Sequence, residues 1–403
     1  LRDTVVPADR GRIYSADGVL LAANSSCWTL RASPREMPED KLALAAKGLA
    51  EILELDEGKL LEKFSDRRSN DCLLRYRVDR AMADAVRDFC EANGITGIRI
   101  NQDSKRWYPQ GEFLASVLGF TNVDNAGVSG LELKYDDLLT GENGVVLTAV
   151  NAWGYTLEQS YETERFPTEG DGLRLTIDAN IQHYLENALG YAVKEHHVAA
   201  RAVGIVMDVN TGGIIASATY PNFDLEKYNT DDAYLTQLYA DESQPLFNRA
   251  LNGIFTPGSV FKPLVALAAL EEGVITPTSH PVNCDGAYHY YAPDYEPGCL
   301  GVHGEVDVYG AIRNSCNAFF FDVGRMLTIH KMHTYAELFA LGEKTGCELN
   351  ETAGIMSDPK TYTERHGANW YDGLTIQAAI GQCDDMFTPI ELAEYCAMIA
   401  NGG

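Results

Sequence analysis

The sequence lacks long hydrophobic runs and is poor in positive charge. Its longest uninterrupted apolar stretch, residues 263–270, is far shorter than the ~18 residues that cross a bilayer, so we expect no membrane span within this sequence. Lys and Arg number 32 against 58 Asp and Glu, which gives a formal net charge of −26. A nucleic-acid-binding protein requires a basic face, and this balance therefore excludes such a partner.

An initiator methionine and an even number of cysteines are also absent. The chain opens in mid-pattern at Leu1 without a signal peptide, so we expect a further segment upstream of residue 1. The nine cysteines cannot all pair within one chain, which excludes a complete intramolecular disulfide framework. Their number does not decide the redox compartment.

The 403 residues are enough for two or three domains. The polar stretch 160–171 carries charge, Pro and Gly without periodicity, as a linker does, and places a boundary between residues 1–165 and residues 166–403. In the second domain, the apolar runs 202–209 and 214–219 flank a Gly-rich turn and predict an antiparallel hairpin. Strands around a bundle of helices indicate an α/β (α+β) fold.

Ser259 and Lys262 are the most informative residues, because a hydroxyl and an amine three residues apart at a helix start can form a nucleophile and its base. Pro257-Gly258 marks an abrupt entry into the helix, the setting that reactive serines favour. The apolar residues 264–270 predict a buried helix, and burial lowers the pKa of a lysine. The pair predicts acyl transfer through a serine.

Residues 313–317, Arg-Asn-Ser-Cys-Asn, form a second element ahead of an apolar segment. A hydroxyl beside an amide, Ser315 and Asn317, suits proton relay and recognition of an amide. The simpler interpretation is that both residues cap the helix that follows. Their pairing with Ser259 and Lys262 favours the catalytic interpretation.

These two elements resemble the Ser-x-x-Lys and Ser-x-Asn boxes of the class B penicillin-binding proteins, the D,D-transpeptidases that cross-link peptidoglycan and are the targets of β-lactams. The order of the boxes along the chain makes the resemblance specific, and it covers nearly the whole sequence. Further stretches that resemble the family are residues 10–22, 127–132, 207–216, 220–224 and 248–250.

The resemblance implies an N-terminal pedestal or dimerisation domain, followed by a transpeptidase domain with an antiparallel sheet flanked by helices and without its last strands. It implies that Ser259 is the acyl-enzyme nucleophile, Lys262 its general base, Ser315 a proton shuttle and Asn317 a ligand of the substrate backbone. Catalysis of this kind requires no cofactor. Which residue takes the first proton in such sites is disputed.

The resemblance also implies partners and a location. The substrate is a peptidoglycan stem peptide ending in D-Ala-D-Ala, β-lactams acylate the same serine, and a membrane glycan polymerase of the wall machinery is the protein partner. The expected location is the outer face of the cytoplasmic membrane, with an anchor helix upstream of residue 1. Roles in division, elongation (cell shape) and sporulation are not separated. The alternative is a non-catalytic β-lactam-binding or structural subunit on the same fold.

Lys344-Thr345-Gly346 resembles the family's third box, a Lys-Thr-Gly on an edge strand facing the serine. Those residues follow a predicted helix end near Gly342 and precede an acidic, turn-rich run with poor strand character. A sequence motif indicates a function only where its expected secondary structure is present, and here the edge strand is not predicted. We therefore interpret the triplet as a structural landmark and expect the catalytic third box to be missing from residues 1–403. Cys383 stands where the family usually has glycine.

Cys284, Cys299, His303 and Cys316 form the spacing C-x14-C-x3-H-x12-C, which ends inside the Ser-x-Asn box. Four such ligands without an open position suit a closed, structural zinc site. We expect the Cys316 side chain to point away from Ser315 and Asn317. The alternatives are a Cys284–Cys299 disulfide and separate buried thiols, and Asp285 could replace one ligand.

Overall fold

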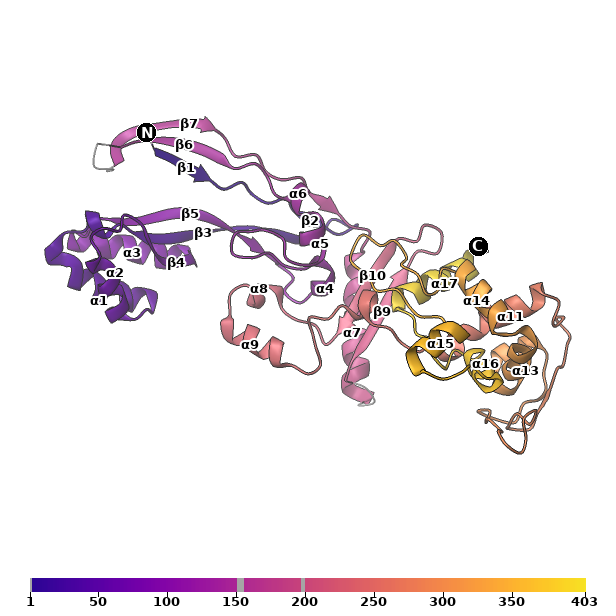
Figure 1. Cartoon of the computed structure of the whole chain (residues 1–403). Coiled ribbons are helices and arrows are strands. Elements are labelled where there is room, and N and C mark those ends of the chain that lie inside the picture. Colours follow the sequence, from indigo (N-terminus) through magenta and orange to yellow (C-terminus); the bar gives the residue numbers. More distant parts are fainter. Residues whose placement is uncertain (1, 151–155, 197–199) are drawn as a thin grey trace. The chain divides into compact units, whose positions relative to one another are not determined.

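The computed structural model describes residues 2–150, 156–196 and 200–403, which divide into two compact units. The first unit consists of residues 1–111, 119–175 and 225–231, and the second of residues 112–118, 176–224 and 232–403. Figure 1 labels their helices and strands. None of the helices in the described part of the chain combines the length and the apolar character that crossing a bilayer requires.

The first unit holds two sheets and a small helical core. One sheet has the order β4-β3-β2-β8 with β5 paired to β3, and the other has the order β1-β6-β7. The strands are β1 (Arg2–Val6), β2 (Ile13–Tyr14), β3 (Leu20–Ala32), β4 (Cys72–Val78), β5 (Ile98–Trp107), β6 (Gly144–Val150), β7 (Thr156–Arg165) and β8 (Leu173–Arg174). The helices are η1 (Pro34–Glu36), η2 (Glu39–Lys41), α1 (Leu42–Leu53), α2 (Glu57–Ser65), α3 (Arg80–Asn93), α5 (Gly130–Lys134), α6 (Asp136–Leu139) and α8 (Leu225–Tyr228).

The linker prediction for residues 160–171 is wrong at its start. Strand β7 continues to Arg165 and pairs antiparallel with β6, with Arg165 opposite Val145. The segment's Thr and Tyr residues favour strands, and the partner strand satisfies backbone groups that a linker would leave to water. A polar composition therefore does not exclude a strand here.

The second unit begins with the predicted hairpin. Strands β9 (Ala202–Met207) and β10 (Ile214–Tyr220) pair antiparallel, Gly212 takes the left-handed conformation (φ 72°) in the turn, and α7 (Ala179–His196) packs against both strands. The other elements are α4 (Ala115–Leu118), α9 (Asp232–Ala240), α10 (Arg249–Asn252), η3 (Gly258–Phe261), α11 (Lys262–Glu271), β11 (Asn283–Cys284), β12 (Gly304–Glu305), α12 (Val308–Arg313), α13 (Asn317–Leu327), α14 (Ile329–Leu338), α15 (Pro359–His366), α16 (Asp372–Ala378) and α17 (Pro389–Asn401). The expected α+β fold with antiparallel strand pairs is confirmed.

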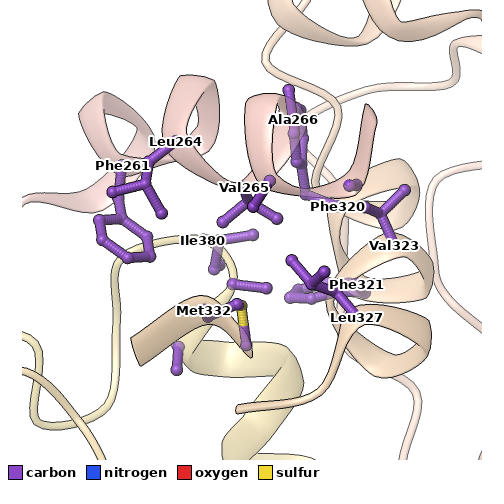
Figure 2. Packing of buried hydrophobic residues seen from close by; sticks show 14 of the residues in the cluster. Phe261, Leu264, Val265, Ala266, Phe320, Phe321, Val323, Leu327, Met332 and Ile380 are labelled. Carbon is purple, nitrogen blue, oxygen red and sulfur yellow. The ribbon is translucent and has the colours of Figure 1, made fainter. Parts of the chain in front are cut away.

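The main core of the second unit lies between α11 and α13 (Figure 2). Phe261 at the end of η3 and Leu264 and Val265 of α11 pack with Phe320 and Phe321 of α13, and all five are buried. Burying apolar side chains of this size contributes about 1.5–3 kcal/mol each. This packing fixes η3 and the start of α11, where Ser259 and Lys262 lie, against the start of α13.

Candidate active site

Ser259 lies in a tight first turn, the 3₁₀ helix η3, and Lys262 begins the α-helix α11. The sequence predicts α-helical spacing for this pair, but a 3₁₀ turn has three residues, which brings positions i and i+3 into line. The Lys262 N–H donates to the Ser259 carbonyl. Ser259 is exposed, whereas Lys262 is only 2 % exposed.

Two glycines set the position of this turn. The Gly258 N–H donates to the Gly381 carbonyl over 2.9 Å, and both residues are left-handed, with φ 57° and 70°. A Cβ atom on Gly381 would lie 2.2 Å from the Gly258 carbonyl oxygen. A side chain at position 381 would therefore displace the backbone that carries Ser259.

Ser315 and Asn317 lie in the connection between α12 and α13. Ser315 has φ 50°, an uncommon conformation for a residue with a side chain. Cys316 is the N-terminal cap residue of α13, and its side chain makes no cap hydrogen bond to the first turn. The interpretation that Ser315 and Asn317 merely cap the helix is therefore wrong, because both side chains face the lysine instead.

A chain of hydrogen bonds joins the four predicted residues. Ser315 Oγ donates to Ser259 Oγ over 2.8 Å, and Lys262 Nζ donates to Ser315 Oγ over 3.0 Å. Lys262 Nζ also donates to the Ser315 carbonyl (2.8 Å) and to Asn317 Oδ1 (2.7 Å). Among the described hydrogen bonds, none joins Lys262 Nζ directly to Ser259 Oγ, so the expected contact runs through Ser315.

Opposing influences act on the Lys262 ammonium group. Burial lowers the pKa of Lys262, and the nearby Cys299 and Cys316 thiols oppose this shift. The three acceptors around Nζ favour the ammonium form, and the Phe320 ring lies 5.6 Å from Nζ. The net pKa is below the ordinary value, which makes a neutral amine accessible as a base.

The four residues proposed as metal ligands converge beside this site. The ligand atoms of Cys284, Cys299, His303 and Cys316 all lie within 4.8 Å of one another. Cys299 Sγ lies 3.9 Å from Cys316 Sγ, and His303 Nδ1 lies 3.4 Å from Cys299 Sγ and 3.6 Å from Cys284 Sγ. All three cysteines are free thiols, so the alternative Cys284–Cys299 disulfide is not formed.

The thiol of Cys299 belongs to the ligand cluster and also contacts the start of α13. It accepts a hydrogen bond from the Asn317 N–H over 3.2 Å. Burial raises the pKa of Cys299, but the N–H groups of Ala318, Gly301 and Asn317 outweigh burial and lower it to about 6. Burial and the charge on Cys299 raise the pKa of Cys316 to about 12. Cys316 points toward the cluster, as expected, and leaves Ser315 and Asn317 free.

The loop at residues 284–303, which carries three of the four ligands, is also fixed to α13. Tyr288 is 2 % exposed, and its hydroxyl donates to Asp322 Oδ1 over 2.6 Å. Arg325 pairs with the same carboxylate over 2.9 Å and lies 4.0 Å from the centre of the Tyr290 ring. The loop is therefore held at two places, by the cluster and by this buried network.

Lys344-Thr345-Gly346 has a different setting. The triplet belongs to no strand, and the Lys344 side chain is exposed. Thr345 Oγ1 and the Gly346 N–H donate to the buried Glu351 carboxylate over 2.9 and 2.8 Å. The following Cys347 packs on Ala250, Leu251 and Ile390. The segment thus has the structural setting that the sequence analysis predicts.

Sequence reasoning missed two residues that support the site. The Tyr395 hydroxyl, from α17, donates to the Val260 carbonyl and accepts from the Leu264 N–H, each over 3.1 Å, and so ties the first turn of α11. The Gly298 carbonyl accepts from Asn317 Nδ2 over 3.4 Å. Neither residue has a local sequence signal, because both contacts join distant positions. The contact of Tyr395 with Val260 spans 135 positions, and that of Gly298 with Asn317 spans 19.

Comparisons with known families cover most of the chain. Residues 202–403 match the model of the penicillin-binding protein transpeptidase domain. Residues 5–175 match the model of the penicillin-binding protein dimerisation domain. The four residues Ser259, Lys262, Ser315 and Asn317 all lie within the first of these matches.

Individual relatives agree with these matches. The peptidoglycan D,D-transpeptidase MrdA of Acinetobacter baumannii is 28 % identical over 99 % of this chain and 61 % of its own length. Stage V sporulation protein D of Bacillus subtilis is 30 % identical over 86 % of this chain and 52 % of its own length. The chain thus spans about half to two thirds of these curated relatives. The penicillin-binding protein in its complex with MreC from Helicobacter pylori shares the fold, with a TM-score of 0.82 at 24 % identity over 100 % of this chain and 77 % of that one.

Proposed function

The chain belongs to the class B penicillin-binding proteins, and we propose on this basis that it is a serine D,D-transpeptidase that cross-links peptidoglycan stem peptides. The observation that carries the proposal is the hydrogen-bonded series Ser259–Ser315–Lys262 at the start of a buried helix. A structural subunit would need no such arrangement of a hydroxyl, a relay and an amine with a lowered pKa.

The proposed reaction begins with a proton transfer from Ser259 through Ser315 Oγ to the neutral Lys262 amine. Ser259 Oγ then attacks the carbonyl carbon of the penultimate D-Ala. The peptide C–N bond breaks, and the proton returns from Lys262 through Ser315 to the leaving amine of the terminal D-Ala. Asn317, fixed by Lys262 and the Gly298 carbonyl, contacts the substrate backbone. An acceptor amine takes the acyl group, and β-lactams stop at the acyl-enzyme.

The proposed setting follows from the family. We propose that the protein acts at the outer face of the cytoplasmic membrane, with an anchor upstream of residue 1, beside a membrane glycan polymerase. A solved relative of the same fold is described as a penicillin-binding protein in complex with MreC, and another as part of a peptidoglycan synthase complex of polymerisation and cross-linking. These titles support a partner within the wall machinery.

The experiment that tests the reaction measures D-Ala release from a donor peptide ending in D-Ala-D-Ala as a function of pH, with full-length protein. The neutral fraction of Lys262 rises with pH, so the logarithm of the rate should rise with pH with a slope of about one. The rate should level off at a pH below 10.5, the ordinary lysine pKa, because burial lowers the pKa of Lys262.

The matched control for this profile is Lys262→Arg, which keeps the charge but cannot give up its proton. It should lower the rate by about 10²–10⁴. A rate that is unchanged in Lys262→Arg would show that Lys262 is not the base.

We further propose that Cys284, Cys299, His303 and Cys316 bind a structural zinc ion. Zn–S bonds of about 2.3 Å and Zn–N bonds of about 2.0–2.1 Å at the tetrahedral angle place sulfurs about 3.8 Å apart and sulfur and nitrogen about 3.5 Å apart. The observed separations of 3.9 Å for two sulfurs, and of 3.4 and 3.6 Å for sulfur and nitrogen, fit these values. A bound zinc would stabilise the thiolates and keep the 284–303 loop on the catalytic turn.

The Lys344-Thr345-Gly346 triplet should be dispensable for the chemistry. We expect Lys344→Ala in full-length protein to leave the rate of acylation by a β-lactam within about twofold, because this exposed side chain lies outside any strand. A labelled penicillin and a stopped time course measure that rate. Glu351→Gln serves as a comparison, since it weakens the segment's own hydrogen bonds. Loss of acylation in Lys344→Ala alone would make the triplet catalytic.

A further inference from the structure

A cavity lies in the second unit, which also carries Ser259, but none of the four proposed catalytic residues lines it. It has a volume of about 330 Å³, which is within the range of small-ligand pockets. It lies between the start of β9, the end of α10 and the segment that follows α10. Its apolar walls are Val203, Phe247, Ile254 and Phe255. Neither Ser259 nor Lys262, Ser315 or Asn317 lines it.

Two arginines line the same cavity. Arg249 is only 3 % exposed, and its guanidinium donates to the Ser243 carbonyl and, over 3.3 Å, to the Phe247 carbonyl. Arg201 donates to the Glu242 carbonyl over 2.5 Å. Within the described ranges, no carboxylate oxygen lies within 4.0 Å of either guanidinium. Both cations are therefore bonded only to neutral carbonyls.

One carboxylate lies near this pair without forming a salt bridge to it. The nearby Asp241 carboxylate accepts hydrogen bonds from the Ser243 N–H and hydroxyl, over 2.8 and 2.5 Å, instead of pairing with an arginine. Burial and the charge of Arg201 lower the pKa of Arg249. Asp241 acts on both guanidinium groups through its charge, which opposes the lowering of the Arg249 pKa, while the Ser243 hydrogen bonds and the charges of the two arginines lower the pKa of Asp241. Two cations therefore share one carboxylate that neither of them contacts within 4.0 Å.

We propose that this cavity binds an oxyanion, a carboxylate or a phosphate group, carried on an apolar body. The guanidinium fork matches both anions, because each presents two oxygens to parallel N–H donors. The phenyl rings of Phe247 and Phe255 and the side chains of Val203 and Ile254 form the surface for the apolar part. This binding site is independent of the proposed transpeptidase reaction.

The test uses isothermal titration of the purified protein with benzoate, phenyl phosphate and the neutral analogue benzamide, at an ionic strength held constant with NaCl. Benzoate or phenyl phosphate should bind at least about tenfold more tightly than benzamide, as expected for charge-assisted hydrogen bonds. If benzoate binds more tightly than phenyl phosphate, the cavity prefers a carboxylate, and the opposite order shows that it prefers a phosphate group.

Two variants assign the binding to the arginines. Arg201→Gln should remove the preference for the anion, and Arg249→Lys, which keeps the charge and loses the fork, should weaken it at least about tenfold. Arg87→Gln, which removes an equal charge on α3, should bind as the unaltered protein does. Thermal melting of Arg201→Gln confirms that it is folded. Equal binding of benzamide, no binding of any probe, or an unchanged preference in Arg201→Gln would overturn the proposal.

Discussion

Replacing Ser259 with alanine should abolish covalent labelling by penicillin, which we expect to modify full-length protein with one adduct per chain. The hydroxyl is the only group in the hydrogen-bonded series that is exposed to solvent and can attack a carbonyl carbon. Removing a serine nucleophile that works with its base as a unit lowers the rate by about 10⁶. Intact-mass measurement after incubation with penicillin detects the adduct.

The control for this experiment is Ser279→Ala, which removes a serine hydroxyl from the turn after α11 and should keep full labelling. Peptide mapping places the adduct on the peptide that contains Ser259. Unlabelled wild-type protein would favour a structural subunit over the enzyme, and an adduct that persists in Ser259→Ala would place the nucleophile elsewhere.

Removing zinc should destabilise the second unit. Cys284 and Cys316 are completely buried, and without a metal their thiols lose the cation that stabilises thiolates in an apolar setting. We expect about one equivalent of zinc in protein purified without chelator, and a strong chelator should lower the melting midpoint by at least about 5 °C. Metal analysis and thermal melting measure these two quantities.

Two cysteine variants separate a metal effect from general damage. Cys316→Ser should lose zinc and melt at the temperature of the chelated protein. Cys396→Ser, at an exposed position on α17, should keep zinc and the full midpoint. Less than about half an equivalent of zinc together with an unchanged melt would reject the site, since structural zinc contributes directly to folding free energy.

The sequence alone predicts that Ser259, Lys262, Ser315 and Asn317 meet, because they lie in two short segments with strong local signals. Ser259 and Lys262 lie in one short segment, and Ser315 and Asn317 lie in another. Only the contact between these two segments is distant in sequence. The hairpin β9–β10 is predicted for the same reason, since its turn and its apolar strands are adjacent. The ligand cluster is predicted from spacing, although no local rule indicates that its four residues meet.

Other features depend on contacts that no local pattern encodes. The route from Lys262 through Ser315 involves a residue in the left-handed conformation, which sequence does not signal for a serine. The polar stretch at the end of β7 becomes a strand because β6 supplies hydrogen-bond partners. Cys383 keeps the left-handed conformation (φ 66°) that a glycine would take, so its effect on the turn is strain rather than rearrangement.

The contact between Gly258 and Gly381 bears on how such a site can change over generations. Main-chain atoms hold Ser259 in place, and the close approach excludes every side chain at position 381. Under the proposed function, variation that alters which antibiotics react with Ser259 must therefore arise at positions other than 381. Selection by a drug would then act on those other positions, while this backbone contact keeps Ser259 where the proposed cross-linking requires it.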